Sequence, residues 1–186
     1  MSAAEINDFQ SKYRALVEAA CEWRALQADP SKLANQVFDR LRRRPERSDL
    51  FQLFKVIEQV VLDTYRDEVA LRPNLSLLTG QGGGALAKAP NDTDEMAKLR
   101  GLIPQLNQTQ RDWLQLAYWD ELGLSELAEV RQTDVDTATS KLEQAHVKFA
   151  ALIKRHINPK VAVASVPGLF RSLKPGQLSR WESTLW

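Results

Sequence analysis

The chain has 186 residues, 44% of them hydrophobic, which is enough to bury the core of one domain or two small ones and excludes wholesale disorder. Its formal net charge of +1 lacks the excess of cations that is typical of strongly basic nucleic-acid binders. Any contact with DNA therefore has to come from a local patch.

The sequence predicts a soluble, cytoplasmic protein without a membrane segment. Its start has no basic segment followed by an apolar run, so no signal peptide is expected. No apolar run approaches the roughly 18 residues that a membrane span needs. The single cysteine, Cys21, cannot form an internal disulfide, which fits a reducing compartment. Its place on an apolar helical face predicts a buried side chain.

Three amphipathic helices are expected in the first part of the chain, at residues 6–28, 29–45 and 48–72. In each of them apolar residues recur every three or four positions, the spacing that places them on one face of a helix. The residues expected on these faces are Ile6, Phe9, Tyr13, Leu16, Val17, Ala20 and Trp23; Leu33, Val37, Phe38 and Leu41; and Leu50, Leu53, Phe54, Ile57, Val60 and Val61.

The ends of these helices carry capping and stop signals. Asp29–Ser31 suits a helix start, because it offers capping side chains with a proline in the first turn. Pro45 is expected to stop the second helix, since proline cannot continue it. Either Ser48 or Asp49 is expected to cap the third.

The composition changes at residues 73–92, which contain two prolines and four of the eight glycines. These glycines precede no Lys-Ser/Thr pair and no strand is expected before them, so they do not form a Walker phosphate loop. A flexible linker is expected here, between a first domain at residues 1–72 and a second at residues 93–157.

The second domain is also expected to be helical, with helices at residues 93–103, 107–122, 124–130 and 134–156. The second of these should bury Trp113, Leu114, Leu116, Ala117 and Tyr118. No segment alternates with the period of two that strands show, so the fold class is all-α: two small helical domains and a linker.

Residues 158–186 form an apolar and basic tail with three prolines and without clear helical length. We expect this tail to dock on the body of the protein or on a partner.

Signatures of catalysis are scarce. The two histidines, His146 and His156, lie ten residues apart on one expected helix, which is not metal-ligand spacing, and both are expected to be exposed. Neither a Gly-Xaa-Ser-Xaa-Gly motif nor a Walker loop is present. The sequence therefore predicts a binding protein rather than an enzyme, without a cofactor or metal.

The segment "LSELAEVRQTDVDTATSKLEQAH", residues 124–146, has the spacing of a helix-turn-helix. In that motif the first helix supports the second, whose N-terminal turns enter the major groove of DNA. Ala128 is small enough for a close helix crossing, and Asp134 can cap the second helix. Leu127 and Val130 should pack inward from the first helix, and the inner face of the second should hold Val135, Ala138, Leu142 and Ala145.

The residues that would then lie outward or on the flank of the second helix are Thr139, Ser140, Lys141, Glu143, Gln144 and His146. Hydroxyl and amide side chains can contact base edges, and Lys141 can bind a phosphate or a guanine. An ordinary helical hairpin packs in much the same way, so the pattern alone allows either a DNA-binding motif or a simple hairpin.

The same segment resembles the helix-turn-helix of region 4 in bacterial sigma factors of the extracytoplasmic-function type. That family typically has Ile-Ala-Glu-Ile, a short turn, and Ser-Glu-Gly-Thr-Val-Lys-Ser-Arg-Leu. "LIPQLNQTQRDWLQLAYWDELGLSE" is similar to the Leu-Pro-Xaa-Xaa-Xaa-Arg stretch that precedes it, and "DPSKLANQVFDRLRR" and "LFKVIEQVVLDTYR" resemble parts of region 2. The matching positions in the motif itself are Leu127, Ala128, Glu129, Val130, Thr137, Ser140, Lys141, Leu142 and Ala145.

This resemblance covers about residues 9–155, in the family's domain order. It implies core RNA polymerase and promoter DNA as partners: the first domain would bind the polymerase clamp and the minus-ten element, and the second the flap and the minus-thirty-five element. The DNA-binding residues that it implies are Thr137, Thr139, Ser140, Lys141, Gln144, His146, Lys148, Lys55 and Arg66. The polymerase-binding residues that it implies are Leu33, Gln36, Val37, Phe38, Arg40 and Leu41.

The chain also departs from the family pattern. Ser31, Lys32 and Gln36 stand where the family's clamp helix has acids, and Gln132 stands where its turn often has glycine. If the backbone at Gln132 is left-handed, the side chain costs about 1 kcal/mol.

Two further hypotheses follow from the departures. A Ser/Thr kinase could restore the missing negative charge at Ser31 or, farther along, at Ser48; the alternative is that Ser31 only caps its helix. The rival to a sigma factor is a sigma-like protein that binds an anti-sigma factor or another partner without promoter recognition.

Overall fold

The computed structural model describes residues 3–25, 28–43, 49–71 and 94–175. Within these ranges every regular element is helical and no strand occurs, which confirms the all-α class. The chain divides into two compact units, Met1–Gly80 and Gln81–Trp186. The linker expected at residues 73–92 lies outside the described residues.

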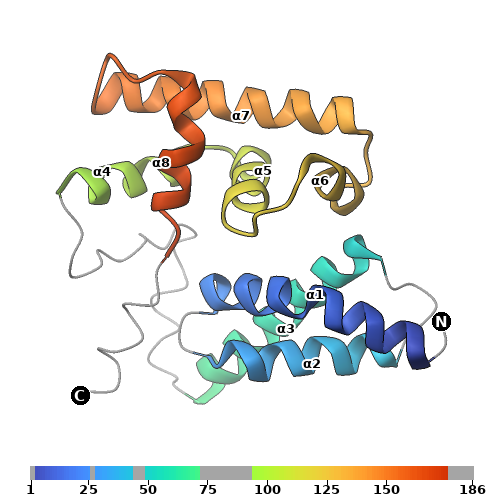
Figure 1. The fold of residues 1–186 in the computed structure, drawn as a ribbon. Helices are drawn as coiled ribbons and strands as arrows, with labels where there is room; N and C mark the ends of the chain where they lie inside the picture. Colours follow the sequence, from blue (N-terminus) through green and yellow to red (C-terminus); the bar gives the residue numbers. More distant parts are fainter. Residues whose placement is uncertain (1–2, 26–27, 44–48, 72–93, 176–186) are drawn as a thin grey trace. The chain divides into compact units, whose positions relative to one another are not determined.

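The first unit consists of three helices that pack against one another: α1 (Ala3–Arg24), α2 (Pro30–Arg42) and α3 (Leu50–Leu71) (Figure 1). Their apolar faces meet as the periodicity predicts. The residues of the expected faces that are buried are Val17, Ala20, Leu33, Val37, Phe38, Leu41, Leu50, Leu53, Phe54, Ile57, Val60 and Val61. Cys21 is also fully buried, as expected. Phe9, Tyr13, Leu16 and Trp23 are only half-buried, because they lie toward the rim of this core.

Aspartates start two of these helices. The Asp29 carboxylate accepts hydrogen bonds from the amides of Ser31 (2.9 Å) and Lys32 (3.4 Å), and Asp49 accepts one from the Gln52 amide at 2.7 Å. Ser31 does not cap α2, contrary to one expectation: its hydroxyl donates to Glu18 of α1 at 3.1 Å. Pro45 and Ser48 lie outside the described residues.

The second unit is built around its longest helix, α7 (Val135–His156), which contacts α4 (Asp94–Leu102), α5 (Gln108–Tyr118) and α6 (Leu124–Val130) (Figure 1). A short 3-10 turn, η3 (Ile103–Gln105), leads into α5. Asn107 and Gln110 form a capping box at the start of α5: each side chain accepts a hydrogen bond from the other's backbone amide, at 3.2 and 2.8 Å. All five apolar residues expected to be buried on α5 are buried.

The described part of the tail docks on the second unit, which was one of the two expectations, and it also contains a short helix that the sequence did not predict. After a 3-10 turn, η4 (Val163–Ser165), helix α8 (Val166–Ser172) packs on α5 and α7. Fully buried Phe170 lies 5.2 Å from the Trp119 ring and 5.3 Å from the Phe149 ring. The Trp119 indole N–H donates to the Phe170 carbonyl at 2.9 Å, and the Lys174 ammonium donates to the Trp119 carbonyl at 2.7 Å. The domain therefore extends well beyond residue 157.

Among the described residues, none of the helices is both long and apolar enough to cross a membrane.

Candidate nucleic-acid interface

Helices α6 and α7 lie where the sequence predicts them and pack against each other across a short turn, an arrangement that a DNA-binding helix-turn-helix and a simple helical hairpin share. Leu127, Ala128 and Val130 of α6 are buried, as expected, and α6 packs on α7. Within the turn at residues 131–134 the Thr133 amide donates to the Ala128 carbonyl at 2.9 Å. Gln132 has a φ of 51°, which is the left-handed region. The turn therefore uses a backbone conformation that favours glycine, at the position where the resembled family often has one.

The start of α7 is held by its own cap. Both carboxylate oxygens of Asp134 accept bonds from Thr137, one from its amide (2.7 Å) and one from its hydroxyl (2.8 Å). These two hydrogen bonds lower the pKa of Asp134, because they stabilise the charged carboxylate. The hydroxyl proton of Thr137 is thus already donated within the helix, so it is not free for a base edge.

An ion pair that the sequence did not suggest holds this motif against α5. Arg131, at the end of α6, pairs with Asp112 of α5 at 2.7 Å, and its guanidinium lies 5.6 Å from the Trp113 ring centre. The two partners are 19 residues apart in the chain, so no local spacing rule could have paired them.

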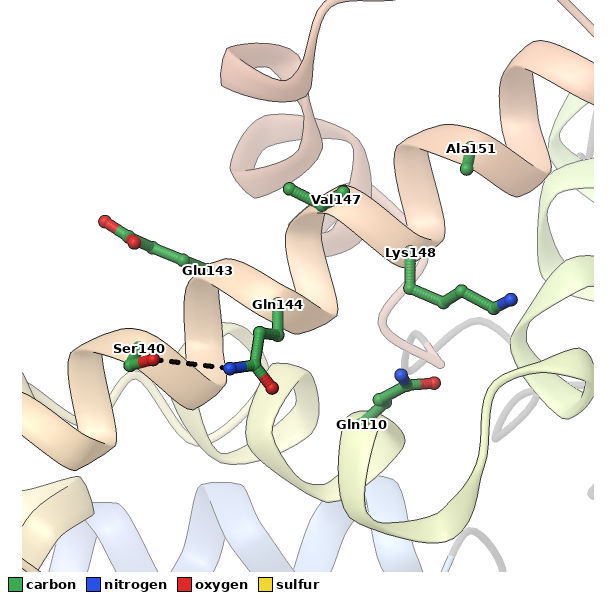
Figure 2. A pocket seen from close by; sticks show the side chains of 7 residues that line it. All are labelled: Gln110, Ser140, Glu143, Gln144, Val147, Lys148 and Ala151. Atoms are coloured by element: carbon green, nitrogen blue, oxygen red, sulfur yellow. Dashed lines mark hydrogen bonds between the residues drawn. The ribbon is translucent and has the colours of Figure 1, made fainter.

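The outward side of α7 presents most of the remaining candidates. Ser140, Lys141, Gln144 and Lys148 are exposed. The Gln144 amide donates to the Ser140 hydroxyl at 3.3 Å (Figure 2). Thr139 is half-buried and its hydroxyl donates to the Val135 carbonyl one turn earlier, at 2.8 Å, so it bonds back into the helix.

An open groove of about 450 Å³ runs beside this outward side, between α7 and the start of α5 (Figure 2). Its lining combines polar side chains with small apolar ones: Gln110, Ser140, Glu143, Gln144, Val147, Lys148 and Ala151. Three of the candidates, Ser140, Gln144 and Lys148, are thereby brought together on one surface.

His146 is placed differently from its prediction. It was expected to be exposed, either outward or on the flank of its helix, but it is half-buried against Tyr118 of α5. Its ring lies 5.5 Å from the Tyr118 ring, and its Nε2 atom shares a hydrogen bond with the Tyr118 hydroxyl. Burial lowers the pKa of His146, with Glu143 opposing the shift, and burial also raises the pKa of Tyr118, with Arg171 opposing. We therefore remove His146 from the DNA-contacting set; His156 is exposed, as expected.

The inner face of α7 needs a smaller correction. Ala138 and Ala145 are fully buried as predicted, and Leu142 is half-buried. Val135, the first residue of α7, is 43% exposed instead of buried.

The DNA-contacting candidates of the first unit are both exposed on α3. The Lys55 ammonium lies 5.8 Å from the Phe51 ring centre. Arg66 has 81% of its side chain exposed and lies 3.9 Å from the Asp63 carboxylate. Asp63 also forms an ion pair with Arg40 of α2 at 2.8 Å. Arg40, one of the polymerase-binding candidates, is therefore already paired within its own unit.

Burial corrects the polymerase-binding set. Leu33, Val37, Phe38 and Leu41 are each at most 6% exposed, inside the core of the first unit. Since almost none of their surface is exposed while the unit is folded, we withdraw them as contacts to another protein. Gln36 remains, exposed on the outer side of α2.

The phosphorylation hypothesis also loses support at Ser31. A phosphate on its hydroxyl would stand beside the carboxylate of Glu18, with that of Asp29 at the cap nearby, and like charges repel. The second candidate, Ser48, lies outside the described residues. We therefore do not include a kinase in the function proposed below.

No cluster of three or more potential metal ligands occurs among the described residues. No protein-family model, no curated protein and no solved structure matches this chain.

Proposed function

We propose that this protein is an RNA polymerase sigma factor of the extracytoplasmic-function type, which directs core polymerase to promoters and has no catalytic activity of its own. The proposal is supported by the resemblance of the sequence, by a three-helix unit that precedes a helix-turn-helix unit, and by the left-handed turn residue at the position of the family's glycine.

The observation that carries the proposal is the exposure of Lys141 on the outward side of α7. It lies two turns from the capped start of the helix, beside exposed Ser140 and Gln144. A lysine can bind guanine or phosphate, and a glutamine can bind adenine through two hydrogen bonds. A capped helix that presents these groups has the arrangement that a major-groove contact needs.

A second candidate function is favoured by the acidic side chains of the same helix. Asp134, Asp136 and Glu143 are exposed along its first half, where they would repel DNA phosphates. A sigma-like protein that binds an anti-sigma factor or another protein, without recognising promoters, accommodates these acids.

The test combines purification and transcription. A sigma factor co-purifies with core polymerase and gives run-off transcripts that start at defined sites on genomic fragments. Co-purification with another protein, with no polymerase bound and no specific transcript, would establish the second candidate instead.

Lys141→Ala then tests the contact itself on a promoter found in this way. We expect it to weaken promoter binding by about 1–3 kcal/mol, the scale of one good base contact. Lys154→Ala is the matched control, because Lys154 is exposed on the same helix but nearly half a turn away around its axis. Equal binding by both variants, in a mobility-shift titration at one salt concentration, would remove Lys141 from the interface.

A further inference from the structure

Three cations of α7 lie in a row on one side of the helix. Lys141, Lys148 and Arg155 are each seven residues apart, and seven residues make nearly two full turns. Neighbouring members of the row are therefore about 10 Å apart along the helix axis, and the whole row is about 20 Å long. All three side chains are exposed, and none of them forms an ion pair with a residue that the structure describes.

The acids of α7 lie on a different side. Five residues of a helix turn through about 140° beyond one full turn, so Glu143 and Lys148 point to different edges of the outward face. Figure 2 shows these two side chains projecting in different directions from α7. Asp136 is seven residues before Glu143 and shares its edge. The outward face of α7 thus has a cationic edge, formed by the row, and an acidic edge, formed by Asp136 and Glu143 in the first half of the helix.

One member of the cationic edge, Lys148, lines the groove between α7 and the start of α5. Gln110 from the first turn of α5 lines the same groove as Gln144 and Lys148 (Figure 2). The amino-terminal end of a helix carries the positive end of its dipole, which favours a nearby anion. Lys148 and the start of α5 therefore favour negative charge where they line the groove. Glu143, which also lines it, does not, and Val147 and Ala151 add small apolar surface.

We propose that the phosphate backbone of a DNA duplex lies along the row Lys141, Lys148 and Arg155, so that α7 meets the duplex along its cationic edge and not by its N-terminal turns alone. DNA carries about one negative charge for each 1.7 Å of its axis, so a row of this length finds phosphates opposite each cation. In this arrangement Asp136 and Glu143 point away from the nearest phosphates. The inference rests on the proposed function only in taking DNA as the partner of the second unit.

The experiment measures the affinity of the full chain for a short labelled duplex of arbitrary sequence, as a function of salt. Each phosphate contact contributes about 0.9 to the slope of log affinity against log salt. The double variant Lys148→Gln with Arg155→Gln should therefore lower the slope by nearly two. It should also weaken binding to promoter and unrelated duplexes by the same factor, because backbone contacts carry no sequence information.

The matched control is the double variant Lys154→Gln with Lys160→Gln, which removes the same charge from exposed positions outside the row. Its slope should stay close to that of the parent chain. Equal losses in the two double variants would overturn the inference, because general attraction and not the row would then hold the duplex. An unchanged slope in the row variant would also overturn it, and so would a parent chain that binds no duplex at low salt. Row-dependent binding in a chain that starts no transcript would keep the inference and refute the sigma factor.

Discussion

Helices α2 and α7 differ in what their polar side chains contact. On α2 they reach neighbouring helices: Ser31 bonds Glu18 and Asn35 bonds Arg14, both of α1, and Arg40 pairs with Asp63 of α3. On α7 the polar side chains of the outward face bond within the helix, or, like the cations of the row, form no ion pair with a described residue. The polar side of α2 therefore helps to hold its own unit together, whereas that of α7 remains available for another molecule.

The largest expected effect tests whether the apolar side of α2 is core. Phe38 is 2% exposed, so Phe38→Ala should lower the free energy of unfolding by about 3–5 kcal/mol, through lost burial and a cavity. Gln36→Ala on the exposed side of α2 should change it by less than about 0.5 kcal/mol. Denaturant unfolding measures both. A Phe38→Ala variant of normal stability that no longer binds polymerase would return this residue to the interface.

The next effect concerns the crossing that presents α7. Ala128 is 5% exposed between α6 and its neighbours, so Ala128→Leu should cost about 1–3 kcal/mol of stability by overpacking, and DNA binding should fall with it. Ala151→Leu adds the same side chain at an exposed position of α7 and serves as the control. If both variants melt at the temperature of the parent chain, α6 and α7 do not cross closely.

A smaller effect, of opposite sign, is expected in the turn between these helices. Gln132→Gly should raise stability by about 0.5–1 kcal/mol, since glycine adopts the left-handed backbone without a steric penalty. Gln105→Gly, in a 3-10 turn where φ is negative, should lower stability by a similar amount. Thermal melts compare the two; a destabilising Gln132→Gly would mean that the glutamine side chain makes a contact that outweighs the strain.

The smallest effect is a pH dependence at His146. Its pKa is lowered in the folded state, so below about pH 6.5 the unfolded chain takes up a proton that the folded chain does not. The stability that neutral His146 contributes is therefore present above that pH and declines as the pH falls toward the lowered pKa. His146→Gln should show a smaller decrease of Tm than the parent chain between about pH 7.5 and 5.5. Identical decreases would show that His146 does not couple protonation to folding.

The sequence could predict the helices and their buried faces because both depend on local spacing. The bounds of α7 and its Asp134 cap agree with the prediction, and all six residues expected in the core on α3 are buried. Local spacing could not show that Arg40 pairs with Asp63, 23 residues away, or that Tyr118 lies against His146, because these contacts depend on how helices pack. The spacing places Leu33, Val37, Phe38 and Leu41 on an apolar face that the structure buries, whereas their polymerase-binding role was implied by the resemblance alone.

The position of α8 decides how much of this chain a fragment of the second unit must contain. A fragment that ends with α7 at His156 would lack Phe170, which fills the space between the rings of Trp119 and Phe149. It would also lack two hydrogen bonds of Trp119: the one that its indole N–H donates to the Phe170 carbonyl and the one that its carbonyl accepts from Lys174. The exposed aromatic surface would make such a fragment prone to self-association. A fragment of the second unit for crystallisation or NMR should therefore extend at least through Lys174, so that it keeps the hydrogen bond from this residue to the Trp119 carbonyl.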